Sequence, residues 1–510
     1  MSGADLPPSL GGAAAATPPS GPAEPAEATG LLGRVAASFT AWAERWIPDA
    51  FVFALIATAV VVVCGVVSAA LAHASTAAST GPAVGAALID VVTAWGGGFW
   101  ELVPFTMQMA LVIITGYVVA TARPVYRAIA ALAGLPREPR TAIAMVALFA
   151  MLSSWLNWGF SLIFSAMLAK EVARRVRGVD YRAVAASAFL GLGSVWAQGL
   201  SGSAALQMAT RSALPESIRR IVEGNGQVPA GVIPFAHTIF LWQSLLSVLI
   251  ELVVVTAVLY AAAPIAARAR TAADLGIDLG VSPLDQAEPP RRHAPGEWLE
   301  HVPVLNALFV ALSVGYLWLY FRAAEAPLNA LNLNTINLIF LTAGVALHGT
   351  PARLMRAVKE ATPGVWGVIL QFPFYAGIAA IIVKSGLNEH IAHLFARVSG
   401  PRSFPALIAC YSAVLGVFVP SGGSKWVIEA PYVMQAAHDL HVHLGWTVAV
   451  YDLGEALANL VQPFWMLPIL GLFGLRARDV MGYTFLVFVV LAPLVLAMVT
   501  LLGMTLTYPL

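Results

Sequence analysis

Four short polar runs interrupt otherwise apolar stretches of the chain, and their residue types suit the binding of a small charged solute. The first two are Asn157-Trp158-Gly159 and Gln198-Gly199-Leu200-Ser201-Gly202-Ser203. The other two are Pro420-Ser421-Gly422-Gly423-Ser424 and the segment from Gly454-Glu455 through Asn459 to Gln462-Pro463. A helix that begins after such a break directs unpaired N–H groups and its positive dipole end at the gap, which suits a carboxylate. Carbonyl oxygens at the break, with Asn and Ser side chains, suit a small cation such as Na⁺.

Two charged residues lie beside these breaks, inside apolar sequence where a charge is costly and needs a reason. Lys425 could pair with a substrate carboxylate; the alternatives are a snorkelling lysine or a partner for Glu429. Glu455 could couple transport to a proton or cation, or it could be the structural partner of a nearby polar group. Asp452 and Glu251 are expected to be structural or interfacial.

The composition indicates which elements must hold these runs. Of the 510 residues, 59% are hydrophobic and 11% are charged, whereas a typical soluble domain is about 45–50% apolar and about 25% charged. So few charges cannot cover a water-facing surface, which argues against a soluble enzyme. The long apolar runs predict an all-α polytopic membrane protein with roughly ten spans. A net charge of +1 gives no reason to expect a nucleic-acid partner.

The apolar runs predict full crossings over most of the chain after residue 50. These crossings lie near 50–72, 102–122, 182–208, 238–263, 302–321, 333–349, 363–383, 445–474 and 480–507. The segment 84–100 is interrupted by three glycines and is expected to lie at the membrane interface.

The polar segments divide the chain into a tail and two halves. Residues 1–30, rich in Ala, Pro, Gly and Ser, are predicted to be a disordered cytoplasmic tail. Residues 31–264 form the first half, which opens with an amphipathic surface helix over 31–47. The polar stretch 265–300 is predicted to be a cytoplasmic linker loop, and 301–510 form the second half.

Two apolar stretches do not fit a single crossing. Between Arg140 and Lys170 lie 29 residues, which are too many for one crossing and too few for two. Both flanks are basic, so the positive-inside rule places both in the cytoplasm and predicts a re-entrant helical hairpin with its tip at 157–159. The stretch 402–438, broken at 420–424, is predicted to be a second hairpin that enters from the outside.

The basic residues support this topology. Of the 28 Lys and Arg residues, the topology places 20 on the inside and seven on the outside, and Lys425 lies within the second hairpin. This bias predicts a cytoplasmic N-terminus and an external C-terminus.

The two halves resemble each other weakly at an offset of 263 residues. Gln108 corresponds to Gln371, and Asn157-Trp158-Gly159 corresponds to Pro420-Ser421-Gly422. Each half contains a span, a broken hairpin and a span with a polar break, and the charges give matched spans opposite directions. We therefore predict two inverted repeats, each with a re-entrant helical hairpin and a discontinuous transmembrane helix, which is typical of secondary transporters.

Several long stretches also carry a family resemblance. They include GGGFWELVPFTMQMALVIITG (96–116), LNWGFSLIFSAMLAKEVARRVRGVDYR (156–182), NTINLIFLTAGVALHGTP (334–351), FVPSGGSKWVIEAP (418–431) and GEALANLVQPFWMLP (454–468). In these, the chain from about residue 31 onward resembles the bacterial short-chain fatty acid transporter family, the AtoE-like permeases related to the ion transporter superfamily.

The resemblance implies a plasma-membrane permease for short carboxylates such as acetoacetate or butyrate, working by an elevator-type motion. The tips at Asn157-Trp158-Gly159 and Ser421-Gly422-Gly423 would clasp substrate and ion, and Asn459 and Gln462 would complete the site. One departure is Ser424-Lys425, where the family often has a third Gly followed by Gln or His. The added cation could tighten carboxylate binding or replace a bound ion.

These observations predict a non-enzymatic secondary symporter of short-chain monocarboxylates in the bacterial inner membrane. The coupling ion would be H⁺ or Na⁺, with Na⁺ possible at the hairpin tips; no cofactor or other metal is expected, and a homodimer is left open. The alternatives are a transporter of another small carboxylate or organic anion, and a passive anion channel. An intramembrane hydrolase is disfavoured because the chain contains no Gly-x-Gly-Asp, Gly-x-Ser-x-Gly or His-Glu-x-x-His motif.

Overall fold

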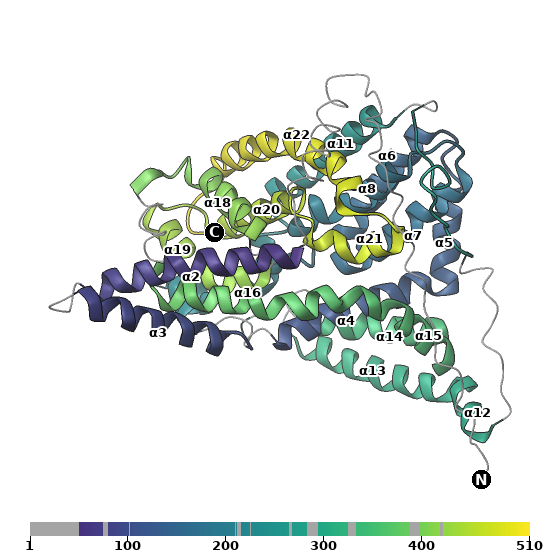
Figure 1. Ribbon diagram of the computed structural model, residues 1–510, viewed down its shortest axis with the longest axis horizontal. Helices are drawn as coiled ribbons and strands as arrows, with labels where there is room; N and C mark the ends of the chain where they lie inside the picture. Colours follow the sequence, from purple (N-terminus) through teal and green to yellow (C-terminus); the bar gives the residue numbers. More distant parts are fainter. Residues whose placement is uncertain are drawn as a thin grey trace, which may run out of the picture.

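The computed structural model describes most of the chain after residue 49. The described residues are 50–74, 80–100, 103–209, 211, 216–224, 226–264, 268–282, 294–324, 333–387, 397–418 and 422–510. All regular elements in these ranges are helices (Figure 1), so the predicted all-α class is confirmed. The predicted tail (1–30) and surface helix (31–47) lie outside the described residues.

The first half contains ten helical segments that position the site or its surroundings. They are α2 (Ala50–Ala74), α3 (Thr80–Gly98), α4 (Val103–Thr121), α5 (Arg123–Ala133), α6 (Pro139–Leu156), α7 (Trp158–Arg175), α8 (Tyr181–Gly193), η1 (Val195–Gln198), α9 (Ser203–Met208) and α11 (Trp242–Ala262). Three short segments precede α11: α10 (Glu216–Glu223), η3 (Pro229–Gly231) and η4 (Phe235–His237).

The described part of the second half also consists of long and short helical segments. It contains α12 (Pro295–His301), α13 (Val304–Ala323), α14 (Leu333–His348), α15 (Pro351–Ala361), η6 (Thr362–Val365), α16 (Trp366–Lys384), α18 (Phe404–Phe418), α19 (Gly422–Asp439), α20 (Leu444–Asn459), η7 (Phe464–Met466), α21 (Leu467–Phe473) and α22 (Ala477–Gly503).

Seven helices in the described ranges are long and apolar enough to cross a membrane, and a bent pair could be an eighth. That pair joins Thr106–Thr121 to Arg123–Ala133 at 72°. One of the seven is Pro139–Leu156, so the first helix of the predicted re-entrant hairpin is itself as long as a span. The multi-pass character is confirmed, whereas the re-entrant path stays a prediction.

The helices differ sharply in how far the protein covers them. Only 11% of the apolar window of α13 is buried and 28% of that of α2, whereas 94% of the window over Tyr181–Met208 is buried. In Figure 1, α3 and α13 lie along the lower edge, α2 crosses the middle beside α16, and α8 and α20 lie inside the upper part. The interrupted helices therefore lie in the protein interior, and the continuous outer helices present apolar side chains to the surroundings.

The three glycines near residue 97 end α3 instead of interrupting it. The helix is continuous over Thr80–Gly98, so the predicted break within 84–100 is wrong. The physical reason is close packing: a Cβ on Gly98 would overlap Ala380 Cβ in α16 and lie 3.2 Å from Ala376 O. The glycine lets two helix backbones approach each other.

The predicted breaks fall at or near the ends of separate described helices. In the first half, Asn157 separates α6 from α7, and residues 194–202 separate α8 from α9 except for the short η1. In the second, α18 and α19 flank residues 419–421, which lie outside the described ranges, and α20 is separated from η7 and α21. The inverted symmetry of the two halves remains a prediction.

Two glycines at the 263-residue offset pack each interrupted helix against its hairpin. A Cβ on Gly191 in α8 would overlap Ala150 O in α6, and one on Gly454 in α20 would overlap Ala409 O in α18. Because the backbones touch at these points, each hairpin and its interrupted helix form one tightly packed unit.

Part of the predicted linker loop is docked on the turn between α7 and α8. Arg270 N donates to Asp180 Oδ2 at 3.0 Å, and Tyr181 N donates to Arg270 O at 2.8 Å. Asp180 also caps α8 by accepting from Ala183 N at 2.9 Å. Residues 268–282 are therefore held against the helices that carry the first break.

Candidate functional site

The tip of the second hairpin lies against both interrupted helices. A Cβ on Gly422 would lie 3.3 Å from Trp196 Cη2 in η1, 3.4 Å from Glu455 Cγ in α20 and 3.5 Å from Ser203 Cβ in α9. Four elements from the two halves of the chain therefore meet at this tip. The bare backbone at Gly422 is what permits the approach.

A side chain from the first half holds this tip in place. Gln207 Nε2 in α9 donates to Gly423 O at 2.7 Å. Ser421 lies outside the described residues, and of Ser424 the structure describes the helical backbone only.

A buried ion pair lies one turn beyond the tip. Lys425 Nζ pairs with the Glu455 carboxylate, and the two side chains are 2% and 0% exposed. The ammonium also donates to Ser412 O at 2.8 Å and lies 5.1 Å from the centre of the Tyr451 ring. A charge removed from water needs a partner of opposite charge, and Glu455 is that partner.

One alternative partner for Lys425, Glu429, is engaged elsewhere. Tyr451 Oη donates to Glu429 Oε2 at 2.7 Å. Because Lys425 is buried and pairs with Glu455, the alternative of a Glu429 partner is wrong, and so is that of a snorkelling lysine. The lysine turns to α20 because the packing of α19 on α20 offers it the Glu455 carboxylate within the protein interior.

A third buried carboxylate, Asp452, closes the N-terminus of α9. Its oxygens accept from Ala204 N at 3.1 Å and Ala205 N at 3.3 Å. The N–H groups of this half-helix thus meet a carboxylate of the protein itself. Asp452, Glu429 and Glu455 are all buried, and the described structure places one ammonium, Lys425, among them.

The first hairpin tip is closed by neutral hydrogen bonds. Asn157 Oδ1 accepts from Phe160 N at 2.8 Å and so caps α7, and Trp158 N donates to Ser201 Oγ at 3.0 Å. A Cβ on Gly159 would overlap Val112 Cγ1 in α4. This tip is therefore joined to the α8–α9 break and pressed against α4.

The remaining predicted residues between α8 and α9 contact neighbouring parts of the protein interior. Gln198 Nε2 donates to Glu251 Oε1 in α11 at 2.7 Å, which gives both side chains a structural partner. Gly202 is the N-cap of α9, and a Cβ there would overlap Ala197 O. Gln198 and Gly202 therefore shape the break rather than the second tip.

Asn459 and Gln462 form a chain of hydrogen bonds across the second break. Asn459 Nδ2 donates to Leu192 O at 3.0 Å, Gln462 Nε2 donates to Asn459 Oδ1 at 2.8 Å, and Phe464 N donates to Gln462 Oε1 at 2.7 Å. These bonds satisfy backbone groups that the breaks release. They also tie the end of α20 to the end of α8.

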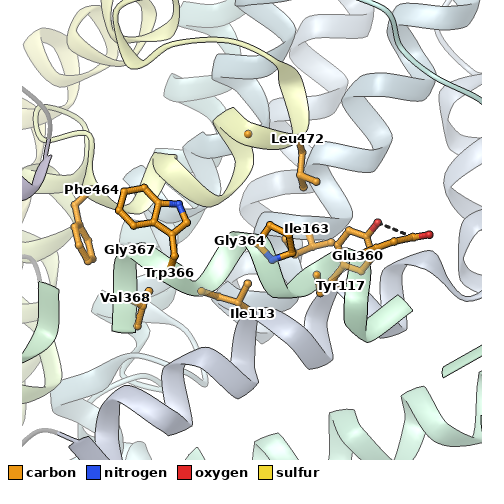
Figure 2. Close-up of a pocket in the computed structure, with 13 residues that line it drawn as sticks. Ile113, Tyr117, Ile163, Glu360, Gly364, Trp366, Gly367, Val368, Phe464 and Leu472 are labelled. Atoms are coloured by element: carbon orange, nitrogen blue, oxygen red, sulfur yellow. Dashed lines mark hydrogen bonds between the residues drawn. The ribbon is translucent and has the colours of Figure 1, made fainter. Parts of the chain in front are cut away.

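A cavity that sequence reasoning missed lies beside the second break. Its volume is about 300 Å³, at the lower end of the range for small-molecule sites. In Figure 2, Phe464 and Trp366 lie at one end of it, and the hydrogen bond from Tyr117 Oη to Glu360 Oε2 (3.1 Å) lies at the other. No Lys, Arg or His is among the described residues that line it. A carboxylate would find no counter-charge there.

Comparison with known proteins identifies the family. The family described as "Short chain fatty acid transporter" matches residues 31–502. The chain belongs to the short-chain fatty acid transporter family. The family and the membrane-spanning helices together make it a multi-pass membrane transporter.

Two bacterial members of the short-chain fatty acid transporter family are similar over nearly their whole length. One, from Escherichia coli (strain K12), is 35% identical over 454 residues, which cover 89% of this chain and 96% of the relative. The other, from Haemophilus influenzae, is 34% identical over 469 residues, covering 91% and 98%. Both are provisionally named short-chain fatty acid transporters.

Two solved transporters share a more distant likeness with this family member. The Alcanivorax borkumensis YdaH transporter has a TM-score of 0.46 at 16% identity, covering 83% of this chain and 88% of that one. Neisseria gonorrhoeae MtrF, described with a class of antimetabolite efflux pumps, has a TM-score of 0.49 at 12% identity, covering 92% and 98%. At these scores neither likeness bears on mechanism.

Proposed function

We propose that the protein is a secondary active transporter that carries a short-chain fatty acid, or another small monocarboxylate, together with H⁺ or Na⁺. The family supports the substrate class. The observation that carries the proposal is the buried Lys425 ammonium beside a hairpin tip, where helices from both halves meet. A monocarboxylate needs one counter-charge, and an ammonium in a site shielded from water supplies it strongly.

Alternating access would follow an elevator-type movement of the hairpins and interrupted helices. The backbone contacts at Gly191 and Gly454 favour movement of each hairpin with its interrupted helix. The outer helices α2, α3 and α13, whose apolar faces are exposed, would stay in the lipid. We place the protein in the bacterial inner membrane with a cytoplasmic N-terminus, because the basic residues favour that orientation.

The cavity beside Phe464 would be part of the route. It lies between α4 and the η6–α16 segment on one side and α7 with η7–α21 on the other (Figure 2). Its apolar lining suits a short alkyl chain in transit, and its lack of a cation suits passage rather than tight binding of a carboxylate.

Uptake into proteoliposomes tests the proposal. We expect labelled butyrate to accumulate when an inward proton or sodium gradient is imposed, and unlabelled C2–C6 monocarboxylates to compete. A dicarboxylate that competes better would favour the alternative substrate class. Uptake that neither a protonophore nor a sodium ionophore changes would overturn secondary active transport.

Counterflow separates a carrier from a passive anion channel. In a carrier, unlabelled butyrate on one side accelerates entry of labelled butyrate from the other, because the loaded site returns faster than the empty one. Absence of this acceleration, with uptake that follows the membrane potential alone, would favour a channel.

A further inference from the structure

We infer that Glu455 is the proton-binding residue of the transport cycle, and that the substrate carboxylate takes its place on Lys425. The inference rests on the proposed function and chooses the proton as the coupling ion. It follows from the contacts of one ion pair and from the charges around it.

In the structure, Glu455 already occupies the position that a substrate carboxylate needs. Its carboxylate pairs with Lys425, and both side chains are enclosed. Gly416 and Gly422 border the pair: their Cβ atoms would lie 3.0 Å from Glu455 Oε2 and 3.4 Å from Glu455 Cγ. The two glycines let the backbone of both hairpin arms pack closely on the pair, so the carboxylate can leave Lys425 only when the tip moves.

The groups that face Glu455 cannot support two ionised carboxylates at once. Lys425 and Glu429 face it from α19, Tyr451 and Asp452 lie on its own helix, and Tyr411 and Tyr432 adjoin Glu429. Lys425 is the one cation in this described set. A substrate anion would add a fourth carboxylate to a set of three that has one cation.

A displaced Glu455 would also lack stabilising partners. Its Oε1 accepts no hydrogen bond from any described group, so Lys425 provides its main stabilisation. A buried carboxylate without a counter-charge takes up a proton. The displaced Glu455 is therefore the group that binds the coupling proton.

The exchange balances in atoms and charge. The ionised Glu455 carboxylate leaves Lys425 and takes one H⁺ to become a carboxylic acid, while the substrate RCOO⁻ forms the new ion pair with the Lys425 ammonium. No covalent bond other than the O–H bond forms. One proton enters with one carboxylate, so transport is electroneutral, and release reverses both steps.

Calorimetry on the purified full-length protein tests this step. Butyrate is titrated at several pH values in buffers of different ionisation enthalpy, which reports the protons taken up per butyrate bound. We expect about one proton to be taken up per butyrate by the unsubstituted protein. The dissociation constant for butyrate should rise about tenfold per pH unit over the pH range in which Glu455 is ionised in the butyrate-free protein. Binding requires a proton, so affinity falls as pH rises.

Glu455→Gln should bind butyrate without a linked proton and with an affinity independent of pH. Butyrate should also raise the thermal stability of E455Q more than that of the unsubstituted protein, because it restores a counter-charge to Lys425; this readout serves if E455Q folds poorly without ligand. E455Q should keep counterflow but lose accumulation driven by a pH gradient.

Two further variants complete the test. Glu251→Gln alters another buried glutamate, which Gln198 can still contact, and should keep the linked proton. Loss of the linked proton in E429Q but not in E455Q would overturn the assignment to Glu455. Butyrate binding that requires Na⁺ and no proton would overturn the inference and leave the proposed function standing. If no C2–C6 carboxylate binds or is carried, both the inference about Glu455 and the proposed function are contradicted.

Discussion

The described residues around the two predicted hairpin tips differ in chemistry. At the first tip, the Asn157 cap and the bond from Trp158 N to Ser201 Oγ satisfy the break with neutral groups. At the second, Lys425 carries a charge that Glu455 balances from another helix. One helix break is therefore satisfied by neutral hydrogen bonds, and the other lies beside a buried ion pair. In the proposed cycle, the first tip holds the shape of the site, and the second supplies a charge for which the substrate competes.

The largest expected effect is that of Lys425→Ala, which removes the charge by which the second tip differs from the first. It leaves Glu455 buried without a partner, and breaking a buried pair in this way costs about 3–5 kcal/mol. We expect butyrate binding and uptake to be lost, and thermal unfolding in detergent to occur at a markedly lower temperature. In the K425A/E455A double variant, stability should partly return while transport stays lost. Unchanged butyrate affinity in K425A would show that Lys425 is no ligand.

The next effect is at Gly159, where the first tip presses on α4. Gly159→Ala places a methyl group into Val112 Cγ1, and overpacking of this kind costs about 1–3 kcal/mol. Thermal unfolding should show the loss, and Val112→Ala in the same chain should restore most of it. Restored stability together with restored uptake would mean that this contact is structural, in line with the structural role of the first tip. Failure of V112A to compensate would contradict the packing described at this tip.

A smaller effect is expected for Asn157→Ala, which removes the cap of α7. Loss of an N-cap costs about 1 kcal/mol. The Michaelis constant for butyrate should change little, because the first tip carries no charge for the substrate. Asn157→Asp keeps an acceptor for Phe160 N and should retain the stability. A large rise in the Michaelis constant in N157A, with stability intact, would show that the first tip also binds substrate.

The smallest effect on stability is expected for a substitution that places a side chain in the cavity beside Phe464. A Cβ on Gly471 meets nothing within 4 Å, so Gly471→Leu should change the free energy of unfolding by no more than about 0.5 kcal/mol. If the cavity is on the route, the maximal uptake rate should fall while butyrate binding at the second tip stays unchanged. Uptake at the normal rate would place the route elsewhere.

Local sequence was sufficient to predict the breaks themselves. Glycine, proline and polar residues inside apolar runs disfavour a continuous helix, and the structure interrupts its helices near Asn157 and after Asn459. The all-α class and the multi-pass character follow from the same local patterns. Roughly ten spans are predicted, whereas the described ranges contain seven, or eight with the bent pair. The re-entrant paths, the inverted symmetry and the tail before residue 50 stay predictions.

The partners of the charged groups could not be predicted, because they depend on packing between distant segments. The sequence leaves Lys425 with several alternatives, Glu429 among them, and the lysine pairs with Glu455 on the next helix. Asp452 caps α9, which is more than 200 residues away in sequence. The cavity is likewise lined by residues from several helices. Lining glycines such as Gly364 and Gly471 are too common in the sequence to indicate a cavity by themselves.

The most direct test of the exchange between Glu455 and the substrate is an infrared difference spectrum recorded as butyrate binds to the purified protein. If Glu455 takes up the proton, we expect a new C=O band of a protonated carboxylic acid that shifts in D₂O, is absent in E455Q and persists in E429Q. Butyrate binding without such a band, or with an unchanged band in E455Q, would contradict it.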